Sequence, residues 1–117
     1  MSYKIKNEYG VITIENEVIK RIAGYSALDC YGIVGMAAKN VKDGWVQLLK
    51  KESLTKGIRL TINENKIDFN LHIIVEYGTN IAVIADSTIN TIRYKVEDYL
   101  GIKVSSVNIF VEGVRVD

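Results

Sequence analysis

The feature that most constrains the fold is a period-two pattern over residues 58–76. Apolar and polar residues alternate in two runs, 58–63 and 66–76, with Glu64-Asn65 between them. This pattern predicts two strands joined by a two-residue turn, each strand with one apolar face. The apolar pairs would then face each other: Ile58 with Leu71, Leu60 with Phe69, and Ile62 with Ile67. Because a one-residue slip would expose half of them, the pattern predicts the register too.

Helical periodicity flanks this hairpin. A first helix is predicted after Asn16, which is suited to cap it, and a longer one after Asn80, with Gly101 at its C-terminal end. The small residue Gly24 would let the first helix approach a neighbouring backbone closely. The longer helix has an apolar stripe formed by Ile81, Ile84, Ala85, Thr88, Ile89, Ile92, Val96, Tyr99 and Leu100.

The remaining segments complete a mixed order of elements. Strands are predicted at residues 10–14, after Gly32 and at 104–111, and a small helix is predicted to start at Asp43 and to include Trp45. The order is strand, helix, short strand, small helix, hairpin, helix, strand. It predicts an α+β fold in two layers, with helices packed on one face of a mainly antiparallel sheet, in the manner of a split β-α-β unit. Residues 1–117 are expected to form one domain.

Composition excludes several classes of site. The chain has 117 residues, a net charge of +1, one cysteine and one histidine. One Cys and one His cannot form a Cys/His zinc site, and no glycine-rich nucleotide loop is present, so neither a metal nor another cofactor is expected. No apolar run is long enough to cross a bilayer, and the N-terminus is too polar for a signal peptide. These features predict a cytoplasmic protein.

His72 is the first candidate for catalysis. In the predicted register it lies on the polar face of its strand, with Glu76 about 13 Å further along. General acid–base catalysis requires a partner within hydrogen-bond reach, and no nucleophile is placed nearby by the pattern. We therefore expect no catalytic residues, and His72→Ala should change stability little. Tyr77, at the end of this strand, is expected to be half-buried with its hydroxyl in solvent.

A candidate partner surface follows from the distribution of charge. Residues 39–66 contain seven basic and three acidic residues, a net charge of +4. The residues expected to bind a partner are Trp45, Lys50, Lys51, Lys56 and Arg59. Tryptophan and arginine are frequent contributors to binding energy, and lysines attract an acidic partner. The alternative is that Trp45 covers one end of the core and that the lysines are solvated surface.

Phe110 is a second candidate for an interface. If Val107, Ile109 and Val111 face the core, Phe110 must point outward from the last strand. An exposed phenylalanine on a strand needs cover, either from the chain's own tail or from a second copy of the chain. The sequence thus predicts a homo-oligomer.

The spacing Gly32-Ile33-Val34-Gly35 matches the G-x-x-G loop with which KH domains hold a nucleic-acid backbone. Its two central residues are apolar, so it offers no charge to a phosphate. An RNA-binding module that uses this loop and the basic segment 39–66 remains the alternative, although nucleic acid is disfavoured.

Three stretches taken together resemble the alkaline-shock-protein family of Gram-positive bacteria. They are residues 29–37 (DCYGIVGMA), 74–81 (IVEYGTNI) and 107–116 (VNIFVEGVRV). The likeness extends from about Tyr3 to Val116 and is strongest to the small housekeeping YloU-type branch. The chain departs from many members in having Ala82 where they have proline, and in lacking their polar or acidic extensions.

This resemblance implies a non-enzymatic protein of cell-envelope homeostasis or stress response that self-associates and binds a partner. The implied partner is a membrane-anchored protein or a protein of lipid metabolism, so membrane association would be indirect. A link to fatty-acid kinases also leaves open an acyl-chain or lipid-linked accessory role. The resemblance supplies no catalytic, cofactor-binding or metal-binding residues.

Overall fold

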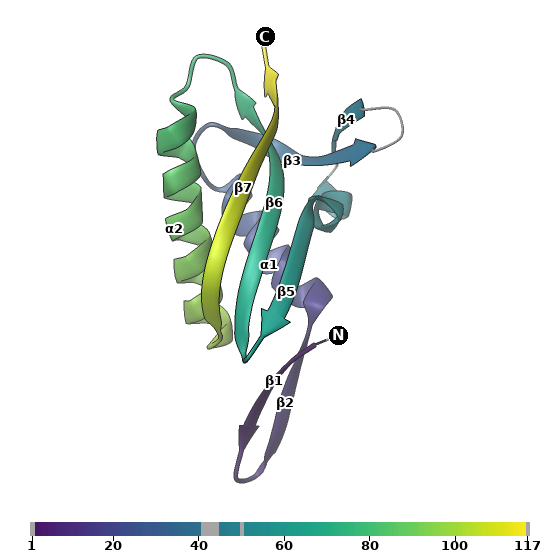
Figure 1. The fold of residues 1–117 in the computed structure, drawn as a ribbon, viewed down its shortest axis with the longest axis vertical. Helices are drawn as coiled ribbons and strands as arrows, with labels where there is room; N and C mark the ends of the chain where they lie inside the picture. The colour runs from purple at the N-terminus through teal and green to yellow at the C-terminus, as the bar shows by residue number, and fades with distance from the viewer. Residues whose placement is uncertain (1, 41–44, 50, 117) are drawn as a thin grey trace.

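The computed structural model describes residues 2–40, 45–49 and 51–116, without the side chains of residues 39–40, 45–47 and 51–53. The elements, drawn in Figure 1, are β1 (Ser2–Asn7), β2 (Gly10–Glu15), α1 (Asn16–Leu28), β3 (Ile33–Asn40), β4 (Trp45–Leu48), the 3₁₀ helix η1 (Lys51–Gly57), β5 (Ile58–Asn63), β6 (Lys66–Glu76), α2 (Ile81–Leu100) and β7 (Lys103–Arg115). The predicted α+β class is confirmed.

Strand β6 is the centre of the main sheet. Along one side it pairs in parallel with β7, from Lys66↔Lys103 to Glu76↔Arg115. Along the other side it pairs antiparallel first with β5, up to Ile58↔Leu71, and then with β3, from Met36↔Ile73 onward. Strand β4 extends the sheet beyond β3. The parallel pair β6–β7 is joined through α2, as expected for a β-α-β unit.

The β5–β6 hairpin has the predicted register, including Ile58↔Leu71, Leu60↔Phe69 and Ile62↔Ile67. Its turn residues Glu64 and Asn65 have positive φ angles of 50° and 63°. Two consecutive left-handed residues characterise the turn whose twist matches that of the flanking strands.

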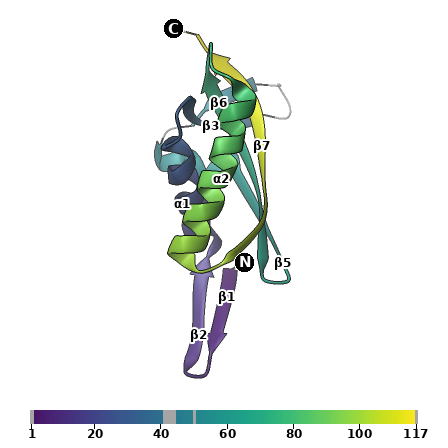
Figure 2. The same cartoon turned by 90° about the vertical axis from the view of Figure 1, so that its left-hand side faces the viewer.

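In the view of Figure 1, α1 lies behind the sheet and α2 stands at its left-hand side, and the turned view of Figure 2 shows α1 and α2 side by side. The Asn80 side chain accepts a hydrogen bond from the Val83 amide at 3.2 Å, and Gly101 ends α2 with φ 67°, so both predicted ends are confirmed. The apolar stripe of α2 is buried in its middle, at Ile84, Thr88, Ile92 and Val96. At its ends Ile81 and Tyr99 are exposed, which the stripe did not predict.

The start of α1 differs from the prediction. Glu15 occupies the N-cap position with no side-chain cap, and Asn16 is the first helical residue. Strand β2 ends at Glu15, and α1 begins directly with Asn16. Because an N-cap residue needs a non-helical backbone, the side chain of Asn16 cannot cap α1. Gly24 has a close neighbour, but that neighbour is a side chain and not the predicted backbone, because a Cβ there would lie 2.3 Å from Leu54 Cδ1.

The core lies between β6 and the helices. Five alternate side chains of β6 are 0% exposed: Ile67, Phe69, Leu71, Ile73 and Val75. Strand β7 contains two register shifts, which leave Ser105 and Glu112 as extra residues. Val111, predicted to face the core, pairs with Ile73 but is 36% exposed, so the prediction that it is buried is wrong. Tyr77, expected to be half-buried, is 71% exposed beyond the end of β6.

The predicted small helix is also wrong in place and type. Trp45–Leu48 is strand β4, which pairs with residues 37–40 of β3, and helical structure starts only at Lys51. Pairing with the edge of β3 satisfies backbone groups that the helix would have bonded internally, and such context overrides local propensity. Asp43, the expected start, lies outside the described residues.

Strands β1 and β2 form a separate two-stranded ribbon that projects from the body (Figures 1 and 2). The sequence did not predict β1. The Tyr3 hydroxyl donates a hydrogen bond to the Asn65 carbonyl at 2.6 Å, which ties the base of the ribbon to the hairpin turn. Its far end is exposed, with Tyr9 at 92%.

Candidate functional site

The side of the sheet that faces away from the helices is the candidate site. We call it the outer face and define it by the second set of alternate residues of β6: Asp68, Asn70, His72, Ile74 and Glu76. All five are partly exposed, whereas their neighbours on the inner face are buried. Neither α1 nor α2 covers this set.

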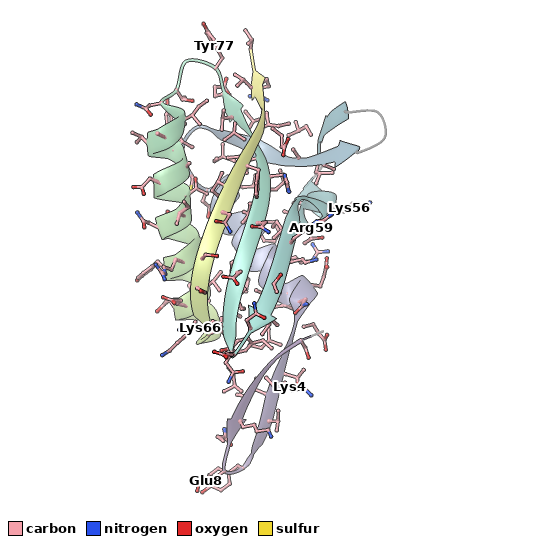
Figure 3. All side chains as sticks on the ribbon, viewed as in Figure 1. Lys4, Glu8, Lys56, Arg59, Lys66 and Tyr77 are labelled. Carbon is pink, nitrogen blue, oxygen red and sulfur yellow. The ribbon has the colours of Figure 1, made fainter. Side chains whose placement is uncertain are left out.

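A hollow of about 370 Å³ opens on the outer face, where β6 exchanges β5 for β3 as its partner. We call it the fork pocket. It is lined by Ala37, Ala38, Lys56, Arg59, Asn70, His72 and Phe110. Lys56 of η1 and Arg59 of β5 lie together on the right-hand edge in Figure 3. Among the described residues, neither of these two cations forms an ion pair or a side-chain hydrogen bond.

His72 is held at the pocket wall by two contacts. Its Nδ1 lies 2.7 Å from Oε1 of Glu112, and the two side chains are 28% and 14% exposed. Its ring stacks on Phe110 with centroids 4.9 Å apart and planes inclined by 18°. Among the described side chains that line the pocket, none carries a hydroxyl or thiol that this imidazole–carboxylate pair could activate as a nucleophile.

Further contacts tie β6 to β7 across the outer face. Ser106 donates a hydrogen bond to Asp68 at 2.8 Å, and Asn108 Nδ2 donates to Asn70 Oδ1 at 2.9 Å. Arg115 pairs with Glu76 at 3.2 Å. The acidic groups on this face thus have partners within the chain.

A second hollow of about 370 Å³ lies further along the outer face. It is lined by Val34, Leu48, Ile74, Gly113, Val114 and Arg115. Most of these side chains are apolar, and Leu48 and Val114 are each nearly half exposed. The outer face therefore combines a cationic hollow with an apolar one.

The structure brings together three of the six residues predicted to bind a partner: Lys56, Arg59 and Phe110. Phe110 is 45% exposed, as expected. Trp45 and Lys51 are placed only by their backbones, in β4 and η1, and Lys50 lies outside the described residues.

Sequence reasoning separated His72 from this surface and missed Glu112. The two residues are in contact on the outer face although they lie 40 residues apart in the chain. Glu112 is the extra residue of the second register shift, and a bulge is able to re-aim a side chain. The available signal was Gly113, because glycine inside a strand pattern often marks a bulge.

The Gly32-to-Gly35 stretch is not an exposed loop. Strand β3 begins at Ile33, and Gly35 is buried in it opposite Ile74. A backbone held in a sheet cannot clamp a nucleic acid as the KH loop does.

Neither helix in the described part of the chain is long and apolar enough to span a membrane.

Comparison with known proteins gives consistent results over almost the whole chain. Residues 4–116 match the family of alkaline shock protein 23, which is described as having a cell envelope-related function. Protein YloU of Bacillus subtilis (strain 168), described as uncharacterized, is 45% identical over 117 residues, which cover 99% of this chain and 98% of YloU. Protein Spy1614 of Streptococcus pyogenes serotype M6, also described as uncharacterized, is 30% identical, with 99% and 97% covered.

A stress response regulator gls24 homolog of Streptococcus pyogenes serotype M3 is 25% identical over 109 residues, which cover 91% of this chain and 59% of that protein. No solved structure matches the chain significantly.

Proposed function

The chain belongs to the alkaline-shock-protein family, and on that premise we propose that it is a non-enzymatic interaction protein of the cell envelope. It acts in the cytoplasm by binding a partner protein through the outer face of its sheet. The partner is a membrane-anchored protein or a protein of lipid metabolism, so membrane association is indirect. The family description and the stress response regulators among its relatives support this role.

The observation that carries the proposal is the composition of the fork pocket. Lys56 and Arg59, which have no partner among the described residues, meet the half-exposed ring of Phe110 at one hollow. Cationic and aromatic side chains of this kind are enriched where binding energy concentrates. The apolar hollow beside it adds area that a partner would bury.

The test is capture of partners from membranes and cytoplasm of the native host. The bait is the wild-type chain, the double variant Lys56→Glu/Arg59→Glu, or the matched control Lys4→Glu. Lys4 lies on the ribbon, far from the other two (Figure 3). We expect at least one protein to be captured by the wild-type bait and by the Lys4→Glu control but not by the double variant. Recovery of the same proteins with all three baits would refute the proposal.

Self-association is the second part of the proposal. Among the described strands, β7 pairs only with β6, and it presents Phe110 and Val114 beside that free edge. A strand with an unpaired edge and exposed apolar side chains is a template for a second copy.

Phe110→Ser should therefore shift the protein toward monomer in sedimentation velocity. It should cost less than about 1.5 kcal/mol of stability, since mainly the stacking with His72 is lost. Tyr9→Ser, at the exposed ribbon tip, is the control and should leave the sedimentation coefficient unchanged. A monomeric wild-type protein at high concentration would contradict this part of the proposal.

A further inference from the structure

Hydrogen-bond donors from several elements line the fork pocket. Between Leu71 and Ile73, strand β6 loses β5 and gains β3, and the two partner strands diverge. The small side chains of Ala37 and Ala38 leave the space between them open. Lys56 enters from η1, Arg59 from β5, and Asn70 and His72 from β6.

The polar groups of β6 are oriented before any ligand arrives. The Asn70 Oδ1 accepts a hydrogen bond from Asn108, so the amide group of Asn70 remains as a donor. The imidazole of His72 is fixed by Glu112 at Nδ1 and by the ring of Phe110. Oriented donors bind an anion better than mobile ones because less conformational freedom is lost on binding.

The bond to Glu112 also determines what the other ring nitrogen does. A carboxylate only accepts hydrogen bonds, so Nδ1 carries the proton that it donates to Glu112. In a neutral ring Nε2 is then an acceptor, and it becomes a donor only after the ring is protonated. An anion in the pocket favours the protonated ring, and by linkage protonation favours the anion.

The charges around His72 agree with this reading. Lys56 and Arg59 line the same pocket and have no acidic partner among the described residues. Glu112 is the acidic group in contact, and Asp68, further along the same strand, accepts from Ser106. The described side chains of β3 at the pocket, Ala37 and Ala38, carry no charge.

We propose that the fork pocket binds an oxyanion, a carboxylate or phosphate group, together with a proton on His72. This inference rests on the proposed function, since the oxyanion is the part of the partner that the pocket receives. Arg59 and Lys56 supply charge, and the amide of Asn70 and Nε2 of His72 supply directed hydrogen bonds.

His72 is the chain's one histidine, which gives the site its own spectroscopic probe. The imidazole nitrogen signals of labelled protein are followed during titration with inorganic phosphate or glutarate, with sodium chloride keeping the ionic strength constant. We expect a saturable shift of these signals toward the protonated ring as the anion binds. Affinity should fall as the pH is raised, because the ring then loses the proton that makes Nε2 a donor.

The variants separate a built site from general attraction between charges. Arg59→Gln should weaken the titrated affinity about tenfold, the effect of losing one charge-assisted hydrogen bond. Lys56→Gln is a second variant in case the first fails to fold. Lys4→Gln is the matched control and should match wild type. Lys4 lines a separate hollow at the ribbon, where it meets Lys6, Lys66 and Lys103 together with Glu64 and Asn65.

Saturation by phosphate alone assigns a phosphate-bearing partner, saturation by glutarate alone assigns an acidic side chain, and saturation by both assigns a general oxyanion site. A shift no larger than that with chloride, or an equal loss in Lys4→Gln, overturns the inference. Oxyanion binding that persists while the capture experiment fails refutes only the proposed function. A captured partner with no oxyanion binding refutes only this inference.

Discussion

The two faces of β6 are built from the same eleven residues but held by different forces. On the inner face, five apolar side chains are completely buried against the helices. On the outer face, polar side chains pair with β7, as His72 does with Glu112 and Glu76 with Arg115. Burial of a large apolar side chain contributes about 1.5–3 kcal/mol, whereas a hydrogen bond contributes about 0.5–1.5 kcal/mol net. The inner face therefore fixes the fold, and the outer face is free to serve binding.

The largest effect should come from the inner face. Phe69→Ala removes a fully buried ring from the centre of the core and should cost about 3–5 kcal/mol. Urea unfolding followed by circular dichroism measures this. If Phe69→Ala were tolerated while His72→Ala unfolded the protein, the roles assigned to the two faces would be reversed.

The packing beneath the inner face provides the next test. Gly24→Ala usually stabilises a helix, but here the added methyl would lie 2.3 Å from Leu54 Cδ1. We expect a loss of about 1–3 kcal/mol from overpacking. The control is Gly10→Ala, where no atom lies within 4 Å, and its melting temperature should stay close to that of wild type. A Gly24→Ala protein as stable as wild type would show that Leu54 moves aside freely.

On the outer face, His72→Ala should cost about 1 kcal/mol, because Glu112 loses its hydrogen-bond donor in a partly buried position. This is more than the sequence alone suggested and much less than the loss at Phe69. A double-mutant cycle with Glu112→Gln isolates the pair. Additive losses in that cycle would mean that the contact contributes nothing to stability.

The smallest effect should be at Lys95 of α2, outside both faces. Its hydrogen bond to Asp29 raises the pKa of Lys95 above its usual value. A raised pKa means that the stabilising contribution is complete below the pKa of the unfolded chain and is lost as the pH rises through the folded value. The difference in melting temperature between wild type and Lys95→Met should therefore shrink as the pH is raised from about 9 to 11. A melting-temperature difference that stays constant over this pH range would contradict a stabilising role for the charge of Lys95.

Sequence patterns predicted what periodicity determines. The hairpin register follows from the alternation of residues 58–76, and the ends of α2 follow from Asn80 and Gly101. Sequence periodicity does not locate the bulges in β7, so the contact between Glu112 and His72 could not be predicted. Strand β4 depends on the neighbouring edge of β3, a long-range contact that local propensity does not contain.

The candidate site was predicted in part. Charge density pointed to Lys56 and Arg59, and strand parity pointed to Phe110. His72 was not predicted to belong to that surface. It does so because β3 and β5 diverge beside β6, which brings Lys56 of η1 close to β6. Sequence periodicity does not show where two strands diverge.

The projecting ribbon offers a practical means of attachment. The molecule is 54 Å long, and Glu8 at the ribbon turn lies at the opposite end from Tyr77 (Figure 3). Exposed turns of this kind accept inserted sequence with little loss of stability. An affinity peptide inserted between Glu8 and Tyr9 would anchor the protein to a sensor surface by its far tip. The fork pocket and the free edge of β7 would then both face the solution.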